Sequence, residues 1–250
     1  MVALHISGVS VNYGARRIVH DFGCDALPAS SLTAVLGPNA AGKSTLIKAI
    51  AGVHAHAGEV ALDVGGNRVR GRELRKRVGY VPQDLPRTAA LRGYETVLIA
   101  ARRAVKDPEW AAAKVMEDLG IAHLAERYVG ELSGGQRQMV GVAQALVTQP
   151  EVLVLDEPTS ALDLRRQLAL LDYVGEWVRT RSAVGIVVIH DINLAARYAD
   201  NLVVMKDGRL HAQGAPREVL HPELIEQVYG VEAEVLSHRD MQLVAPLRAM

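Results

Sequence analysis

Hydrophobic residues along the chain repeat with two periods, one typical of strands and one typical of helices. In residues 2–6, apolar side chains alternate with smaller or polar ones, which predicts a half-buried strand. The short apolar runs 31–37 and 77–83 also predict strands. Between them, residues 44–52 predict a helix that stops at its final glycine. The N-terminal third is therefore predicted to contain both strands and a helix.

The C-terminal third has the same alternation. Residues 151–157 and 184–191 are nearly continuous runs of Leu and β-branched residues, typical of strands buried on both faces of a parallel sheet. Residues 167–178 between them predict a crossover helix. Asp207 and Gly208 separate two alternating runs, which predicts a hairpin. These patterns predict an α/β fold with a parallel core sheet and an antiparallel β edge.

The middle of the chain differs in composition and period. Residues 84–150 are rich in Ala, Glu and Arg, and their apolar spacing is helical. Ser133 is a candidate N-cap of one of these helices. We therefore predict that residues 1–250 form a single domain, in which a core of residues 1–83 and 151–250 carries a helical subdomain at 84–150.

Composition narrows the classes of function. Lys plus Arg and Asp plus Glu both count 28, so the net charge is zero, which argues against a broad nucleic-acid or anionic-membrane surface. Cys24 is the single cysteine, which rules out an internal disulfide and fits a reducing cytoplasm. No apolar run approaches the roughly 18 residues of a membrane helix, and the N-terminus does not resemble a signal peptide. We expect a soluble protein that reaches a membrane only through partners.

A phosphate-binding loop follows the second predicted strand. "GPNAAGKS" fits G-x-x-x-x-G-K-[ST], in which backbone amides cradle phosphate oxygens. Lys43 is expected to reach the outer phosphates, and Ser44 to hold Mg²⁺. The loop lies between a strand and a helix start, where anions are favoured. The candidate nucleotide-binding residues are Gly37, Pro38, Asn39, Ala40, Ala41, Gly42, Lys43, Ser44 and Thr45.

Two adjacent carboxylates end the strand predicted at 151–157. Burial of an unpaired acid is costly, so packing explains them poorly. Asp156 suits a role in Mg²⁺ binding through water, and Glu157 suits a general base that activates attacking water. His190, after another buried strand, is a weaker candidate, because a lone histidine there is more often structural.

A second anion-binding sequence raises the question of why one domain needs two. "ELSGGQRQ" at 131–138 places Ser133, Gly134, Gly135 and Gln136 at a predicted helix start. The residues alone do not say whether this helix start and the phosphate loop bind the same nucleotide.

The ordered set of motifs resembles the ATP-binding-cassette (ABC) ATPases over almost the whole chain. The set comprises Tyr13, "GPNAAGKST", Gln83, "LSGGQ", "VLVLDEPTSALD" and His190. The resemblance implies a P-loop NTPase (RecA-like) core fold and an inserted α-helical subdomain that docks on a membrane subunit. It also implies that Tyr13 stacks on adenine, that Gln83 contacts Mg²⁺ or the attacking water, and that His190 contacts the γ-phosphate.

The resemblance further implies an assembly. Members of that family close as head-to-tail homodimers around two ATP molecules, with Mg²⁺, so "LSGGQ" would bind the nucleotide held by the partner's phosphate loop. Asp163, in "SALD", would contact the opposing subunit. The homodimer would sit on two transmembrane permease subunits at the cytoplasmic face of the inner membrane. Ala40 departs from the family's usual Gly, and if φ is positive there it costs on the order of 1 kcal/mol, which we expect to be tolerated.

Two further stretches narrow the group. Residues 158–174 and 221–247 resemble the ATPases of iron-siderophore, haem and vitamin B12 importers, which also use a substrate-binding protein. An iron–sulfur assembly ATPase is the alternative, although "LSGGQRQ" fits the transporter form better. A DNA-repair role is disfavoured by the neutral charge and the missing coiled-coil insert. Import of zinc, manganese or amino acids stays open, because the substrate contacts other subunits.

Overall fold

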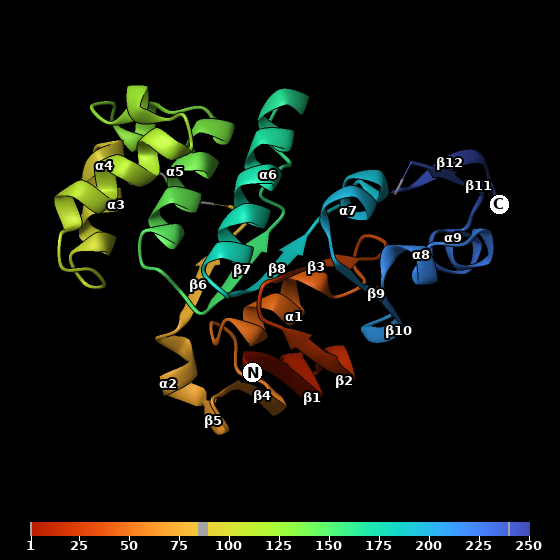
Figure 1. Cartoon of the computed structure of the whole chain (residues 1–250). Helices are drawn as coiled ribbons and strands as arrows, with labels where there is room; N and C mark the ends of the chain where they lie inside the picture. The colour runs from red at the N-terminus through yellow and green to blue at the C-terminus, as the bar shows by residue number, and fades with distance from the viewer. Residues whose placement is uncertain (1, 85–89, 240) are drawn as a thin grey trace.

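The computed structural model describes residues 2–84, 90–239 and 241–250. Helices and strands form layers around a central sheet, and a group of helices lies to one side of it (Figure 1). None of the helices in these three ranges is long and apolar enough to cross a membrane.

The central sheet has six strands in the order β10-β9-β3-β8-β7-β6. Neighbouring strands are parallel from β9 to β6, and β10 is antiparallel to β9. The strands are β3 Ser31–Leu36, β6 Val78–Val81, β7 Val152–Asp156, β8 Val184–Val188, β9 Asn201–Lys206 and β10 Arg209–Gly214. The parallel sheet with an antiparallel edge confirms the predicted α/β class. The predicted hairpin is also confirmed, and its Asp207 and Gly208 both have positive φ, as such a turn requires.

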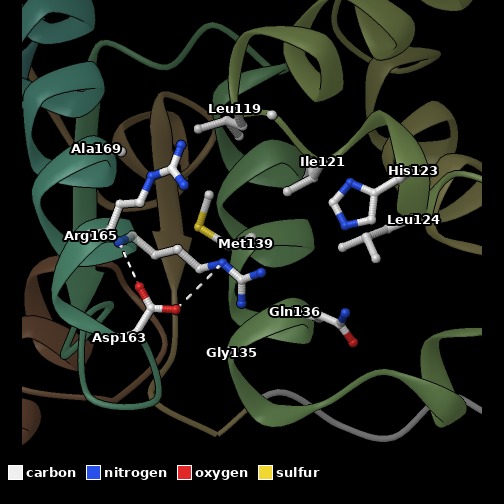
Figure 2. Close-up of a pocket in the computed structure, with 12 residues that line it drawn as sticks. Leu119, Ile121, His123, Leu124, Gly135, Gln136, Met139, Asp163, Arg165 and Ala169 are labelled. Carbon is white, nitrogen blue, oxygen red and sulfur yellow. Dashed lines mark hydrogen bonds and ion pairs between the residues drawn. The ribbon is translucent and has the colours of Figure 1, made fainter.

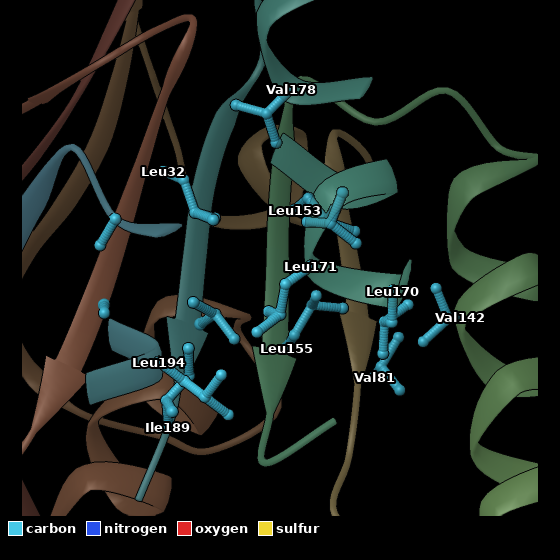
Figure 3. Packing of buried hydrophobic residues seen from close by; sticks show 14 of the residues in the cluster. Leu32, Val81, Val142, Leu153, Leu155, Leu170, Leu171, Val178, Ile189 and Leu194 are labelled. Atoms are coloured by element: carbon cyan, nitrogen blue, oxygen red, sulfur yellow. The ribbon is translucent and has the colours of Figure 1, made fainter. Parts of the chain in front are cut away.

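Strand β7 shows why the central strands read as continuous apolar runs. All five of its residues are buried, and successive side chains enter different hydrophobic cores. Val152 and Val154 pack in the core on the α1 side, and Leu153 and Leu155 pack on the opposite side against α6 (Figure 3). Each face of the sheet is therefore covered, so neither set of alternating positions needs polar side chains.

A four-stranded antiparallel sheet, in the order β2-β1-β4-β5, forms another layer. Its strands are β1 Val2–Tyr13, β2 Arg16–Pro28, β4 Ala57–Val64 and β5 Asn67–Arg70, and α2 Gly71–Arg75 follows. Helix α1, Lys43–Ile50, lies between the two sheets, because its buried Leu46, Ile47 and Ile50 share one core with both of them. This position fixes the direction of the helix that follows the phosphate loop.

The lateral group of helices comes from the middle of the chain. It comprises α3 Gly93–Ala101, α4 Pro108–Asp118, α5 Gly134–Leu146 and the short 3₁₀ turns η1 Ala122–Leu124 and η2 Val129–Glu131. Apart from one isolated bridge between Arg92 and Tyr128, the regular structure of the described part of 84–150 is helical. Residues 85–89, within the stretch expected to meet a membrane subunit, lie outside the described residues. The division of the chain at 83/84 and 150/151 stays a prediction.

The C-terminal third completes the cover of the central sheet. The remaining elements are α6 Leu164–Thr180, α7 Ile192–Tyr198, α8 Pro216–Val219, α9 Pro222–Tyr229, β11 Val231–His238 and β12 Met241–Ala249. Strands β11 and β12 form an antiparallel hairpin beside α7, at the end of the molecule opposite the lateral helices (Figure 1).

Candidate nucleotide-binding site

The phosphate loop connects β3 to α1, and two of its glycines are dictated by backbone geometry. Gly37 has a φ of 145°, and a Cβ there would lie 2.2 Å from the carbonyl oxygen of Met205. Gly42 caps α1 with a φ of 96°. No other residue type fits at Gly37 without moving the neighbouring strand, so the loop's path depends on glycine.

Ala40 also lies in the left-handed region, with a φ of 63°. Because φ is positive, alanine is unfavourable at this position, and the backbone strain costs on the order of 1 kcal/mol. The loop retains its spacing and Gly42 nevertheless, and Ala40 lines the same cleft as the rest of the loop.

Lys43 is folded back onto its own loop. Its ammonium group donates hydrogen bonds to the carbonyl oxygens of Gly37 at 2.8 Å and Pro38 at 2.9 Å. The side chain is only 6% exposed, and burial lowers the pKa of Lys43, although Glu157 and Asp156 oppose that shift. Lys43 is thus a desolvated cation held by weak acceptors, which a phosphate oxygen can replace.

Ser44 and Asp156 bring two oxygen-bearing side chains together next to the phosphate loop. The Ser44 hydroxyl donates to Asp156 Oδ1 at 2.9 Å. Asp156 is 1% exposed, and this burial raises its pKa, while the hydrogen bond from Ser44 lowers it in part. A hydroxyl and a buried carboxylate form a set of oxygen donors that suits Mg²⁺, so the residues present fit this ion.

Glu157 gathers two side chains from distant parts of the chain. Gln83 Nε2 donates to Glu157 Oε2 at 2.8 Å, and His190 Nε2 lies 2.5 Å from Glu157 Oε1. Glu157 itself is 8% exposed and has a φ of 51°, a strained value for a residue with a side chain. The structure therefore brings together Gln83, Glu157 and His190, two of which carried little weight as separate sequence signals.

One cleft of about 440 Å³ is lined by six of the residues described above: Ala40, Gly42, Lys43, Ser44, Glu157 and His190. Tyr13 is nearly half exposed at this cleft, and its ring lies 4.5 Å from the ring of His54, centre to centre. Arg16 and Ile18 also line the cleft and were not found from the sequence. The turn between β1 and β2 places Arg16 opposite Tyr13 in the strand register. A prediction of this turn from the sequence would therefore have indicated Arg16 as a neighbour of Tyr13.

The second anion-binding sequence has the geometry of a capped helix start. Ser133 accepts a hydrogen bond from the Gln136 backbone at 3.3 Å, and the Gln136 side chain accepts one from the Ser133 backbone at 2.9 Å, so the two form a capping box. Gly135 allows close packing, since a Cβ there would lie 2.5 Å from the carbonyl oxygen of Ala161. The start of α5 is thereby fixed against the loop that precedes α6.

This helix start lines a different cavity from the phosphate loop. The cavity, of about 360 Å³, lies between α5, α6 and the segment after α4 (Figure 2). Asp163 borders it, caps α6 by accepting from the Arg166 backbone at 3.0 Å, and approaches the Arg166 guanidinium at 3.7 Å. The structure therefore does not bring Ser133, Gly135, Gln136 or Asp163 into the cleft of Lys43 and Glu157.

Taken together, the fold and the first cleft define a P-loop nucleoside-triphosphatase with paired carboxylates at the end of a core strand. A family model described as ABC transporter matches residues 26–160, which is more than half of the chain. The chain belongs to this family, with the P-loop NTPase fold and ATPase activity that characterise its ATP-binding subunits.

Individual relatives extend over nearly the full length. The hemin import ATP-binding protein HmuV of Gloeobacter violaceus is 37% identical, covering 98% of this chain and 94% of its own. The ferric enterobactin transport ATP-binding protein FepC of Escherichia coli is 33% identical, covering 96% and 92%. A solved metal-chelate type ABC transporter in an inward-facing conformation covers 99% of this chain and 98% of its own, with a TM-score of 0.81 and 23% identity, which supports the fold.

Proposed function

We propose that this chain is the ATP-hydrolysing motor subunit of a bacterial ABC importer for an iron chelate, such as a siderophore, haem or a related cobalamin-type ligand. The relatives named for hemin import and ferric enterobactin transport support this substrate class. The single observation that carries the hydrolytic role is Glu157, held between Gln83 and His190 beside the phosphate loop.

Nucleotide binding begins with exchange of the contacts of Lys43. The γ- and β-phosphate oxygens of ATP replace the carbonyl oxygens of Gly37 and Pro38 as acceptors for its ammonium group. The exchange is favourable because a phosphate carries full negative charge and the ammonium group is already desolvated. Tyr13, at the same cleft, offers its exposed ring to the adenine base.

Ser44, Asp156 and Gln83 are the residues that would hold Mg²⁺. The chemistry that this ion supplies when bound is neutralisation of charge on the outer phosphates. The hydroxyl of Ser44 is turned toward Asp156 in the structure and is therefore already oriented for a shared ligand. Burial of Asp156 strengthens its interaction with a cation.

Hydrolysis requires Glu157 to accept a proton from the attacking water. Its carboxylate oxygens are contacted by Gln83 and by His190. Each oxygen keeps a second acceptor site, so a water can bond to Glu157 while these contacts orient the carboxylate. Glu157 then accepts the water's proton, and His190 contacts the γ-phosphate.

The separate positions of the two anion-binding sequences support a shared site. In our proposal, two copies of the chain associate head to tail, and Ser133, Gly134, Gly135 and Gln136 of one copy bind the ATP held by the other. Asp163, beside this helix start, faces the opposing copy. The homodimer contacts two transmembrane permease subunits at the cytoplasmic face of the inner membrane. A substrate-binding protein acts on the assembly indirectly, without contacting this chain.

The test is isolation of the chain with its native membrane partners, followed by reconstitution in vesicles. We expect ATP-dependent uptake of a ferric siderophore, haem or cobalamin, and loss of uptake in the Glu157→Gln variant. Uptake confined to free zinc, manganese or amino acids would contradict the iron-chelate assignment. Recovery of soluble iron–sulfur assembly proteins in place of membrane subunits would contradict the transport role.

A further inference from the structure

The last three elements of the fold, α9, β11 and β12, pack together at the C-terminal end of the molecule. We call α9 together with the hairpin β11–β12 the C-terminal unit, Pro222–Ala249. Its buried residues Leu224, Ile225, Val228 and Val244 belong to the same hydrophobic core as the central sheet. The unit lies beside α7 (Figure 1), the helix that directly follows His190. It is therefore fixed to the core, and its polar contacts reach α7 and the end of β9.

The first contact joins the hairpin to α7 through one side chain. Asn193 Nδ2 donates to the carbonyl oxygen of Val244 at 3.1 Å, and the backbone N–H of Val244 donates to Asn193 Oδ1 at 2.8 Å. The Asn193 amide thus bonds both polar groups of one residue on the outer edge of β12, as a neighbouring strand would. Only a side chain with a donor and an acceptor side by side can make this pair of bonds.

Asn193 lies three residues after His190, and the backbone between them is held at a second point. Asp191 Oδ1 accepts from the backbone N–H of Asn193 at 2.8 Å and of Leu194 at 3.0 Å. Asn193 therefore ties the start of α7 to β12, and the Asp191 cap holds the backbone between His190 and Asn193. The His190 ring reaches Glu157 from this fixed segment.

The second contact joins α9 to the end of β9. Lys206, which follows Met205 at the end of β9, donates to the carbonyl oxygen of Gln227 at 2.6 Å. Met205 is the residue whose carbonyl leaves no room for a side chain at Gly37.

We propose that the C-terminal unit is a brace that holds His190 in place, with Asn193 as its positioning residue. The inference rests on the proposed function of His190. Asn193 acts on the γ-phosphate side of the reaction, through His190. Loss of its contact with Val244 should consequently lower kcat more than it changes KM.

The test compares Asn193→Ala in the full chain with Ser237→Ala as the matched control. Ser237 bonds Gln242 within the same hairpin, away from α7 and the phosphate loop. We expect kcat for ATP hydrolysis to fall about fivefold or more in Asn193→Ala, with KM changed less than about twofold. Ser237→Ala should match the parent chain.

A spectroscopic signal separates positioning from a general loss of stability. The NMR signal of the His190 ring, assigned by its absence in His190→Ala, should shift in Asn193→Ala and stay in place in Ser237→Ala. Asn193→Asp keeps the acceptor for Val244 N–H and replaces the alanine variant if that does not fold. Wild-type kcat together with an unchanged His190 signal would overturn the brace.

The His190→Ala variant distinguishes the two levels of the proposal. If His190→Ala loses hydrolysis while Asn193→Ala behaves like the parent chain, the brace is wrong and the proposed site stands. If His190→Ala hydrolyses ATP normally, both the role of His190 and its positioning by Asn193 are wrong.

Discussion

Asp156 is a residue whose proposed role in Mg²⁺ binding comes at the expense of the stability of the folded protein. It is 1% exposed, and burial raises its pKa above the value it has in an unfolded chain. At a pH above both pKa values the unfolded state therefore holds the ionised carboxylate at lower free energy. We predict that Asp156→Asn, without nucleotide, raises the melting temperature at pH 7 by about 2–4 °C.

The pH dependence provides the check on this prediction. The gain should be full above the pKa of Asp156 in the folded protein and should disappear as the pH falls below its unfolded value, about 4. Thermal unfolding followed by circular dichroism at several pH values measures it. Glu117→Gln, at an exposed position on α4, serves as the control and should change little. A lower melting temperature at pH 7 would contradict the argument.

Glu157 is the residue on which hydrolysis should depend most. We predict that Glu157→Gln retains ATP binding while kcat falls by roughly 10²-fold or more, because the amide cannot accept the water's proton. The variant should also accumulate as an ATP-bound dimer, visible by size-exclusion chromatography. Lys43→Ala should weaken nucleotide binding itself. Near-normal turnover in Glu157→Gln would remove this residue from the role of base.

Ala40 permits a test of strain in the phosphate loop. Its φ of 63° favours glycine, but the loop keeps its path with alanine in place. We predict that Ala40→Gly changes the affinity for ATP by less than about threefold, measured by isothermal titration calorimetry, since the strain is present before and after binding. A gain of more than about tenfold would show that Ala40 impairs the site.

The reactive side chains of the site could be predicted from the sequence, whereas Arg16 and Ile18, which also line the cleft, were not predicted. Lys43, Ser44, Asp156 and Glu157 could be proposed because each belongs to a short contiguous motif. Gln83 and His190 gained weight only through the family resemblance. The contacts that both make with Glu157 join residues far apart in the chain, and no local pattern encodes such distances.

At the scale of elements, the start of α5 offers a matched pair of substitutions. A Cβ at Gly135 would lie 2.5 Å from the carbonyl oxygen of Ala161, whereas at Gly134 the nearest atom would be the Ala161 side chain at 3.6 Å. We predict that Gly135→Ala lowers the melting temperature by several degrees, because backbone must move, and that Gly134→Ala changes it by less than about 1 °C. Differential scanning calorimetry compares the two. Equal melting temperatures would show that this packing adapts freely.

The hydrophobic pattern of the sequence predicted those strands whose residues are all buried. The strands β7 and β8 were predicted because burial on both faces leaves an unbroken apolar run. Strands β2, β4 and β5 were not located individually, because β2 contains bulged register shifts and many exposed positions, and β5 has only four residues. Where tertiary pairing rather than a repeated pattern defines a strand, one sequence gives little indication of it.

At the scale of the whole molecule, the proposed sharing of sites can be tested by mixing. In a Glu157→Gln background, one chain carries Lys43→Ala and another carries Ser133→Arg, and each should trap little ATP alone. In a mixed dimer, one site combines an intact Lys43 with an intact Ser133 from the other chain. With random exchange, about a quarter of the fully competent level of trapped ATP should return.

Retention of radiolabelled ATP after rapid gel filtration measures the recovery. Subunit exchange is verified independently with two affinity tags, and a mixture of two Lys43→Ala chains serves as the control. If each site were built within one chain, neither chain would hold both intact parts and mixing would restore nothing. That result would show that the start of α5 does not reach the nucleotide of a second copy.

The separation of the phosphate loop and the start of α5 into different cavities also bears on inheritance. In a cell that carries one normal and one defective gene copy, a folded but inactive chain would enter dimers with normal ones. With equal synthesis and random pairing, only about a quarter of the dimers would contain two normal chains. Under the proposed sharing, a chain defective in both Lys43 and Ser133 would leave no complete site in a mixed dimer. Such an allele would therefore be dominant if the protein still folds, whereas alleles that prevent folding would be recessive.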